Sequence, residues 1–196
     1  MCDALTAAGP EEPTLCEGWS TFDMAAHLYV RERDPFAGPG IVLPGPFARV
    51  TEHRMTAAKK KGYNALVDVV RRGPPLHWRL VPDGVHLVEF FVHTEDVRRA
   101  RGDGPRPTDG EREDALWNWL RRGAGRLFAR RAPCGLDVQR PDGARQQLRA
   151  GEPTVTVVGH PTEIVLFLYG RKDAAAVDFE GPDDAVGRLR ATNLGL

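Results

Sequence analysis

The stretch HLVEFFVHTEDV, residues 86–97, is rich in apolar side chains, and Glu89 and His93 interrupt its apolar run. Burying an ionisable group costs free energy unless another group pairs with it. These two residues are four positions apart, so on a helix they lie on the same face, one turn from each other. Because a helix backbone sets the separation of such a pair, the spacing suits two ligands of one metal ion. We therefore predict a helix over residues 84–101 that presents Glu89 and His93 together.

A third ligand is needed for a strong site, and His27 is the best candidate. It lies in the middle of a second predicted helix, next to Ala25 and Ala26, whose small side chains would let another helix approach closely. Two imidazoles and one carboxylate suit zinc or a similar divalent ion, and three protein ligands leave a coordination position open. His86 is an alternative ligand, which we rank below His27 because it lies in the first turn of its helix. A histidine on an apolar face is also often a core residue, so the spacing alone leaves that interpretation open.

Helical spacing of apolar residues and Pro/Gly-rich connectors organise the N-terminal part of the chain. Ser20 and Asp23 form a capping pattern at the start of one helix. Four long helices with short connectors favour an antiparallel bundle. The predicted helices cover residues 1–9, 20–34, 47–72, 84–101 and 109–132, with connectors at 36–46 and 77–82.

The pattern changes after Pro133. Two short strand-like runs flank the turn sequence Pro141-Asp142-Gly143, and PTVTVVG at 153–159 is a β-branched strand. A helix at 160–170, a strand at 175–181 and a last helix follow. We therefore predict an α+β protein in which a helical bundle at residues 1–132 precedes a small α+β domain at residues 133–196.

Composition excludes some classes of function. The chain has 27 Lys and Arg and 27 Asp and Glu, so it has no basic surplus for nucleic acid, and no apolar run is long enough to cross a membrane. Three cysteines without a CxxC pattern indicate free thiols in a reducing compartment, and we expect a cytoplasmic protein. Because the chain opens inside what reads as the last turns of a helix, we also expect a segment upstream of Met1.

Two pieces of the sequence resemble a known family. PTLCEGWSTFDMAAHLYVRERDP at 13–35 and VEFFVHTEDVRRA at 88–100 are similar to the metal-binding N-terminal domain of mycothiol-dependent maleylpyruvate isomerases. That family belongs to the DinB/YfiT-like group of four-helix bundles. The resemblance runs across most of residues 1–132, and it is closest to an uncharacterised actinobacterial branch described only as metal-binding.

The resemblance implies a metal site and a chemistry. The family's ligands correspond here to His27, Glu89 and His93, and its cosubstrate is mycothiol, a small thiol that adds to an electrophile. The segment PTEIVLFLYGR at 161–171 resembles the helix of the family's second domain, which makes Arg171 a candidate for binding a substrate carboxylate. The chain is shorter than a typical family member and its first helix is truncated, so we consider a homodimer in which a neighbouring chain completes the bundle.

Several roles stay open at this point. Asp23 either orients His27 or only caps its helix, Asp96 either orients His93 or pairs with Arg99, and Arg171 either binds substrate or stabilises the end of its helix. We expect the tryptophans at 19, 117 and 119 to be core or wall residues. For function, a thiol-dependent transferase or isomerase is the first hypothesis, a metal- or thiol-sensing binding module the second, and a metal-dependent hydrolase the third.

Overall fold

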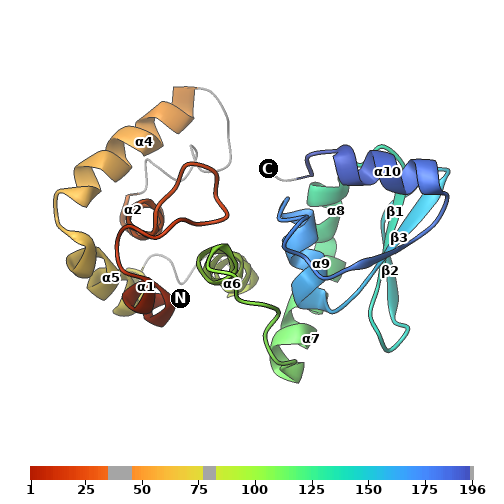
Figure 1. The fold of residues 1–196 in the computed structure, drawn as a ribbon, viewed down its shortest axis with the longest axis horizontal. Coiled ribbons are helices and arrows are strands. Elements are labelled where there is room, and N and C mark those ends of the chain that lie inside the picture. The colour runs from red at the N-terminus through yellow and green to blue at the C-terminus, as the bar shows by residue number, and fades with distance from the viewer. Residues whose placement is uncertain (35–45, 77–82, 195–196) are drawn as a thin grey trace. The chain divides into compact units, whose positions relative to one another are not determined.

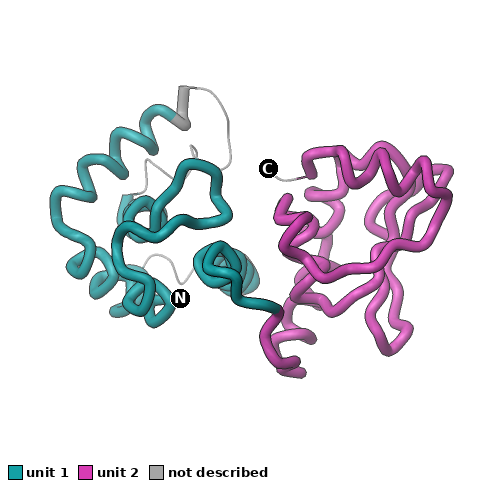
Figure 2. The backbone as a smooth tube through the Cα atoms, in the orientation of Figure 1, with its two compact units in different colours: residues 1–104 teal, residues 105–196 magenta. Residues whose placement is uncertain are grey.

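The computed structural model describes residues 1–34, 46–76 and 83–194. The chain divides into two compact units, Met1–Gly104 and Pro105–Leu196 (Figure 2). This division falls before the fourth predicted long helix, whereas the change in sequence pattern falls at Pro133. The assignment of domains to residues 1–132 and 133–196 therefore stays a prediction.

The first unit is helical (Figure 1). Helix α2 packs against α4 and α5, and α1 packs against α5 and α6. Their shared core contains small and flexible apolar side chains such as Ala25, Met24 and Leu66, all fully buried. The elements are α1 at Cys2–Ala8, α2 at Thr21–Arg33, α4 at Pro46–Lys59, α5 at Tyr63–Arg71 and α6 at Asp83–Ala100.

Two predicted helices are interrupted. The prediction of one helix over 47–72 is wrong, because α4 ends at Lys59 and Gly62, with φ of 87°, precedes α5. The helix expected over 109–132 consists of α7 at Gly110–Trp119, a π-helical turn at Leu120–Ala124 and α8 at Gly125–Ala129. Gly123 interrupts this segment with φ of 104°. In both places glycine adopts a backbone conformation that other residues rarely reach.

The loop over residues 13–20 connects α1 to α2 and is well ordered by its own hydrogen bonds. The backbone N–H of Thr14 donates to the carbonyl of Trp19 at 3.0 Å, and Pro13 and Ser20 form an isolated antiparallel bridge. At its end Ser20 and Asp23 form the predicted capping box of α2. The N–H of Leu15 donates to the carbonyl of Asp96 at 3.1 Å, which attaches this loop to α6.

The second unit is built around a four-stranded sheet of order β2-β1-β3-β4. Strand β1 pairs antiparallel with β2 across the predicted turn and parallel with β3, while β3 pairs antiparallel with β4. Every residue of helix α9 is buried, and α7 packs against it. The elements not yet given are β1 at Gly135–Gln139, β2 at Arg145–Arg149, β3 at Thr154–Val158, α9 at Pro161–Leu168, β4 at Asp178–Glu180 and α10 at Asp183–Ala191.

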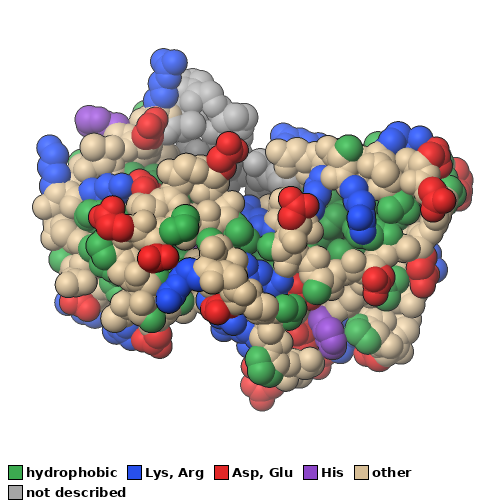
Figure 3. All heavy atoms as spheres, viewed as in Figure 1, with side chains coloured by type: hydrophobic (Ala, Val, Ile, Leu, Met, Phe, Trp, Pro, Cys, Tyr) green, Lys and Arg blue, Asp and Glu red, His purple; other side chains and the backbone are tan. Residues whose placement is uncertain are grey.

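The predicted α+β class is confirmed, whereas a four-helix bundle at residues 1–132 stays a prediction. The connectors expected at 36–46 and 77–82 lie outside the described residues, except for Pro46, at which α4 begins. Within the described part of the chain, no helix is both long and apolar enough to cross a membrane. Acidic and basic side chains are mixed over the face seen in Figure 3, in keeping with the balanced charge of the sequence.

Candidate metal centre

The structure brings the three predicted ligands together. Nε2 of His27, on α2, lies 3.1 Å from Oε1 of Glu89, and Nε2 of His93 lies 3.1 Å from the same oxygen on α6. One ligand atom from each residue falls within 4.8 Å of the other two. The two imidazole rings meet edge to face, with their centroids 5.0 Å apart. The capped helix α2 thus presents its central histidine to the Glu-x-x-x-His pair.

The donor set and its spacing fit a divalent ion. In a tetrahedral zinc site with bonds of about 2.0–2.1 Å, neighbouring ligand atoms are separated by about 3.3 Å. The two N···O separations of 3.1 Å are close to that value. The side chains of His27, Glu89 and His93 are only 7%, 15% and 12% exposed, so an ion held there would be largely shielded from water. His27, Glu89 and His93 are the residues that would hold it, and their role as ligands stays a prediction.

Protonation at the centre follows from burial and close contact. Burial lowers the pKa of His27, so its ring is neutral, as a metal ligand must be. Burial raises the pKa of Glu89, but its hydrogen bonds with His27 and His93 outweigh this and hold that pKa well below its usual range. Burial lowers the pKa of His93, yet its bond with Asp96, the neighbouring Cys16 and its bond with Glu89 raise it well above its usual range. The positive charge of a protonated His93 would offset the charges of its neighbours Glu89 and Asp96.

Asp96 determines which nitrogen of His93 faces the other ligands. Its Oδ2 lies 2.8 Å from Nδ1 of His93, and the carboxylate is fully buried. In the neutral ring Nδ1–H donates to Asp96, so Nε2 presents its lone pair toward Glu89. Two acceptors at 3.1 Å repel each other unless a proton or a cation lies between them. This supports the orienting role for Asp96, and Arg99 donates its Nε–H to Glu95 at 2.8 Å.

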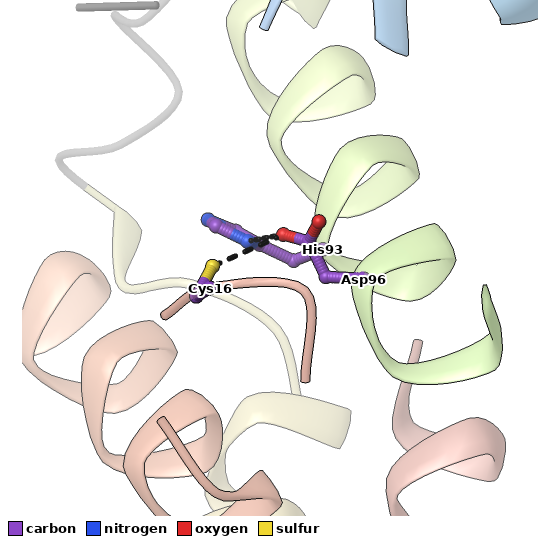
Figure 4. Close-up of side chains that lie close together, drawn as sticks. All are labelled: Cys16, His93 and Asp96. Atoms are coloured by element: carbon purple, nitrogen blue, oxygen red, sulfur yellow. Dashed lines mark hydrogen bonds and ion pairs between the residues drawn. The ribbon is translucent and has the colours of Figure 1, made fainter. Parts of the chain in front are cut away.

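Two residues at the centre were not identified from the sequence. The Nε of Arg31, on α2, lies 3.3 Å from Oε1 of Glu89. The Sγ of Cys16 lies 3.3 Å from Oδ2 of Asp96, and Figure 4 shows Cys16, Asp96 and His93 converging. Arg31 was detectable in principle, since it follows His27 by one helical turn. Cys16 gave no such signal, because it lies in a loop and contacts a residue 80 positions away.

The other candidates have different surroundings. Asp23 takes the capping alternative, because it bonds Ser20 and forms a 2.5 Å ion pair with Lys59. The ring of Trp19 lies 5.1 Å from that of His27, as expected of a wall residue. Among the described residues, the groups of converging ligand atoms do not include His86. Arg171 belongs to the second unit, where its guanidinium donates to the carbonyl of Tyr169 at 2.7 Å, and its catalytic role stays a prediction.

Comparison with known proteins defines the fold. No protein-family model and no curated protein matches the sequence. Two crystal structures of the mycothiol-dependent maleylpyruvate isomerase are similar to the chain, each covering 90% of it and 86% of the isomerase chain. One, of a histidine-to-alanine mutant, has a TM-score of 0.55 at 17% identity, and the other has 0.52 at 19%. The chain therefore has the fold of these structures, and at such identity the similarity speaks for fold alone.

Proposed function

We propose that this chain binds a divalent metal ion, zinc in the first instance, and acts as a thiol-dependent transferase or isomerase on a small electrophile. The observation that carries the proposal is the convergence of His27, Glu89 and His93 on one point in the first unit. The shared fold with a mycothiol-dependent isomerase supports a small thiol, mycothiol or a relative, as the cosubstrate. A reducing compartment such as the cytoplasm suits this chemistry, and the three cysteines form no disulfide among the described residues.

A metal ion held by His27, Glu89 and His93 would supply one property: a thiol coordinated to it would lose its proton readily. The residues of the chain supply the rest. His27 is neutral and buried, Glu89 is ionised, and Asp96 holds the ring of His93 in one orientation. The guanidinium of Arg31 adds a positive charge beside Glu89. With a divalent ion held by His27, Glu89 and His93, the positive charge of Arg31 would leave the centre net positive against Glu89 and Asp96, which would favour an anionic partner such as a thiolate.

The second unit contains one candidate for substrate binding, Arg171. Arg171 follows the buried helix α9 and carries a planar guanidinium suited to a carboxylate. We propose that it binds the carboxylate of the electrophile. A homodimer also stays a prediction, which size measurement in solution can test.

The test combines metal analysis with turnover. The purified protein is loaded with zinc and mixed with mycothiol and a panel of small unsaturated or halogenated acids, and adducts or isomers are measured. We expect about one zinc per chain and product formation that His27→Ala abolishes. His53→Ala is the matched control, since His53 is an exposed histidine on another helix of the same unit.

The same measurements separate the alternatives. Zinc binding without turnover on any substrate would favour a metal- or thiol-sensing module. Product released without added thiol would favour a hydrolase. Only trace metal in the wild-type protein, with no gain on adding zinc, would rule out the metal-dependent form of all three functions.

A further inference from the structure

The loop over residues 13–20 contacts both histidines of the candidate metal centre or their partners. Trp19 packs beside the ring of His27, and Cys16 reaches the carboxylate that holds His93. The loop is attached to α6 through the N–H of Leu15, which donates to the carbonyl of Asp96. One segment outside the two ligand helices is therefore in a position to set the geometry of both rings.

The position of Cys16 is itself well determined. Its backbone N–H donates to the hydroxyl of Thr14 at 3.2 Å, and that hydroxyl is 3.0 Å from the carbonyl of Trp19 and 3.3 Å from that of Cys16. The thiol is half-buried. These bonds fix the backbone of Cys16, and the backbone in turn places Sγ beside Asp96.

Asp96 accepts from two donors through one oxygen. Oδ2 lies 2.8 Å from Nδ1 of His93 and 3.3 Å from Sγ of Cys16, and its residue is fully buried (Figure 4). A buried carboxylate depends on such donors, because burial keeps bulk water from taking their place. His93 is on the same helix as Asp96, whereas Cys16 approaches from a separate segment. The thiol therefore gives the carboxylate of Asp96 a donor from outside helix α6.

We propose that Cys16 is a positioning residue for the metal centre. Its S–H donates to Asp96, the carboxylate holds Nδ1–H of His93, and Nε2 of that ring is thereby directed to the metal position. This rests on the proposed metal site and adds the loop over residues 13–20 to it. Partners of ligating histidines usually change metal affinity by about 10- to 100-fold when removed. Because Cys16 acts one bond further out, its removal is expected to cost roughly 3- to 10-fold.

The experiment measures zinc affinity of the full chain by competition with a chromogenic chelator, in wild type, Cys16→Ala, Cys16→Ser and Asp96→Ala. Cys16→Ala removes the donor and lowers the zinc affinity about 3- to 10-fold. Cys16→Ser keeps an O–H donor and retains most of the wild-type zinc affinity. Asp96→Ala lowers the zinc affinity about 10- to 100-fold. Cys2→Ala is the control, since Cys2 is a half-buried cysteine on α1 that is not in the group of Cys16, His93 and Asp96.

A second readout distinguishes positioning from general stability. The visible spectrum of the Co²⁺-loaded protein reports ligand geometry, and it changes in Cys16→Ala while the melting temperature of the metal-free protein stays near that of Cys2→Ala. Wild-type affinity and an unchanged Co²⁺ spectrum in Cys16→Ala would overturn the role of Cys16 and leave the metal site standing. If wild type binds no zinc, the metal site fails and this proposal fails with it.

Discussion

Glu89 in the first unit and Glu113 in the second are both largely buried glutamates, and they differ in the donors that surround them. Glu113 accepts the backbone N–H and the hydroxyl of Thr162, each at 3.0 Å, at the start of helix α9. Those donors carry protons at every physiological pH. Glu89 faces two imidazole nitrogens, which donate or accept according to their protonation, and the guanidinium of Arg31. A buried carboxylate with permanent donors is structural, whereas one among titratable nitrogens can exchange their protons for a metal ion.

The largest expected effect follows from neutralising each glutamate in turn. Glu89→Gln removes a ligand and its charge, so zinc affinity should fall by at least about 100-fold, more than for a partner outside the ligand set. Glu113→Gln is the matched variant in the second unit and should leave zinc affinity unchanged. Isothermal titration of both proteins with zinc checks this, and equal affinities would remove the distinction between the two carboxylates.

The next effect concerns stability. Glu113→Ala leaves the N–H and hydroxyl of Thr162 without their acceptor inside the protein, and it opens space beside α9. We expect the free energy of unfolding to fall by about 2–4 kcal/mol. Urea denaturation followed by circular dichroism measures it. Zinc affinity is measured on the same sample, and a parallel loss of zinc binding would contradict a purely structural role.

Glu32 extends the comparison to a carboxylate without donors. It is fully buried on α2, and among the described residues neither of its oxygens has a hydrogen-bond partner. Burial raises its pKa to about 7, and Arg33 and Arg31 offset this only in part. Because the pKa of Glu32 is raised in the folded state, the stabilisation that its proton gives to the folded protein is fully present below pH 4.5. This stabilisation is lost as the pH rises through about 7 and is absent above that.

We therefore expect the free energy of unfolding to fall by about 1–3 kcal/mol between pH 4.5 and 7.5 on account of this group. Glu32→Gln should flatten that part of the curve. Thermal unfolding of metal-free protein across the range, with Glu113→Gln as reference, measures the difference. A pH dependence identical in wild type and Glu32→Gln would show that another group is responsible.

The smallest effect separates the two donors of Thr162. Thr162→Val removes the hydroxyl and keeps the backbone N–H, so Glu113 retains one of its two bonds. We expect a loss of about 1 kcal/mol in the free energy of unfolding. The measurement is the same urea titration, and a loss as large as in Glu113→Ala would mean that the hydroxyl carries the whole interaction.

Local pattern predicted much of the fold. Apolar periodicity located α2, Pro and Gly signals helped to place α6 and α9, and the turn at Pro141-Asp142-Gly143 lies between antiparallel β1 and β2 as expected. The errors occur where a single glycine interrupts an otherwise helical pattern, at Gly62 and Gly123. An isolated glycine in a helical pattern costs only about 1 kcal/mol, so the pattern does not tell whether the helix continues.

The residues of the candidate centre differ in how well the sequence predicts their place in it. Glu89 and His93 follow from the i,i+4 spacing, because both belong to one helix. His27 required the assumption that two helices face each other, and the structure places its ring against Glu89. The two interpretations of Asp23 and of Asp96 were undecided in sequence, since a carboxylate three or four residues from a histidine has several partners within reach. Only coordinates show that Asp23 caps α2 while Asp96 bonds His93.

Local sequence pattern was enough to predict most of the helices, the strands and the position of Glu89 and His93 on one helical face. Those features depend on residues a few positions apart, where backbone geometry sets the distance. Only the tertiary structure shows that His27 and Arg31 lie against Glu89 and that Cys16 lies against Asp96. Each comes from another segment, and Cys16 meets Asp96 across 80 positions of chain. Such contacts arise from packing around the shared core, and their distances are set by side-chain volumes and loop hydrogen bonds rather than by spacing along the chain.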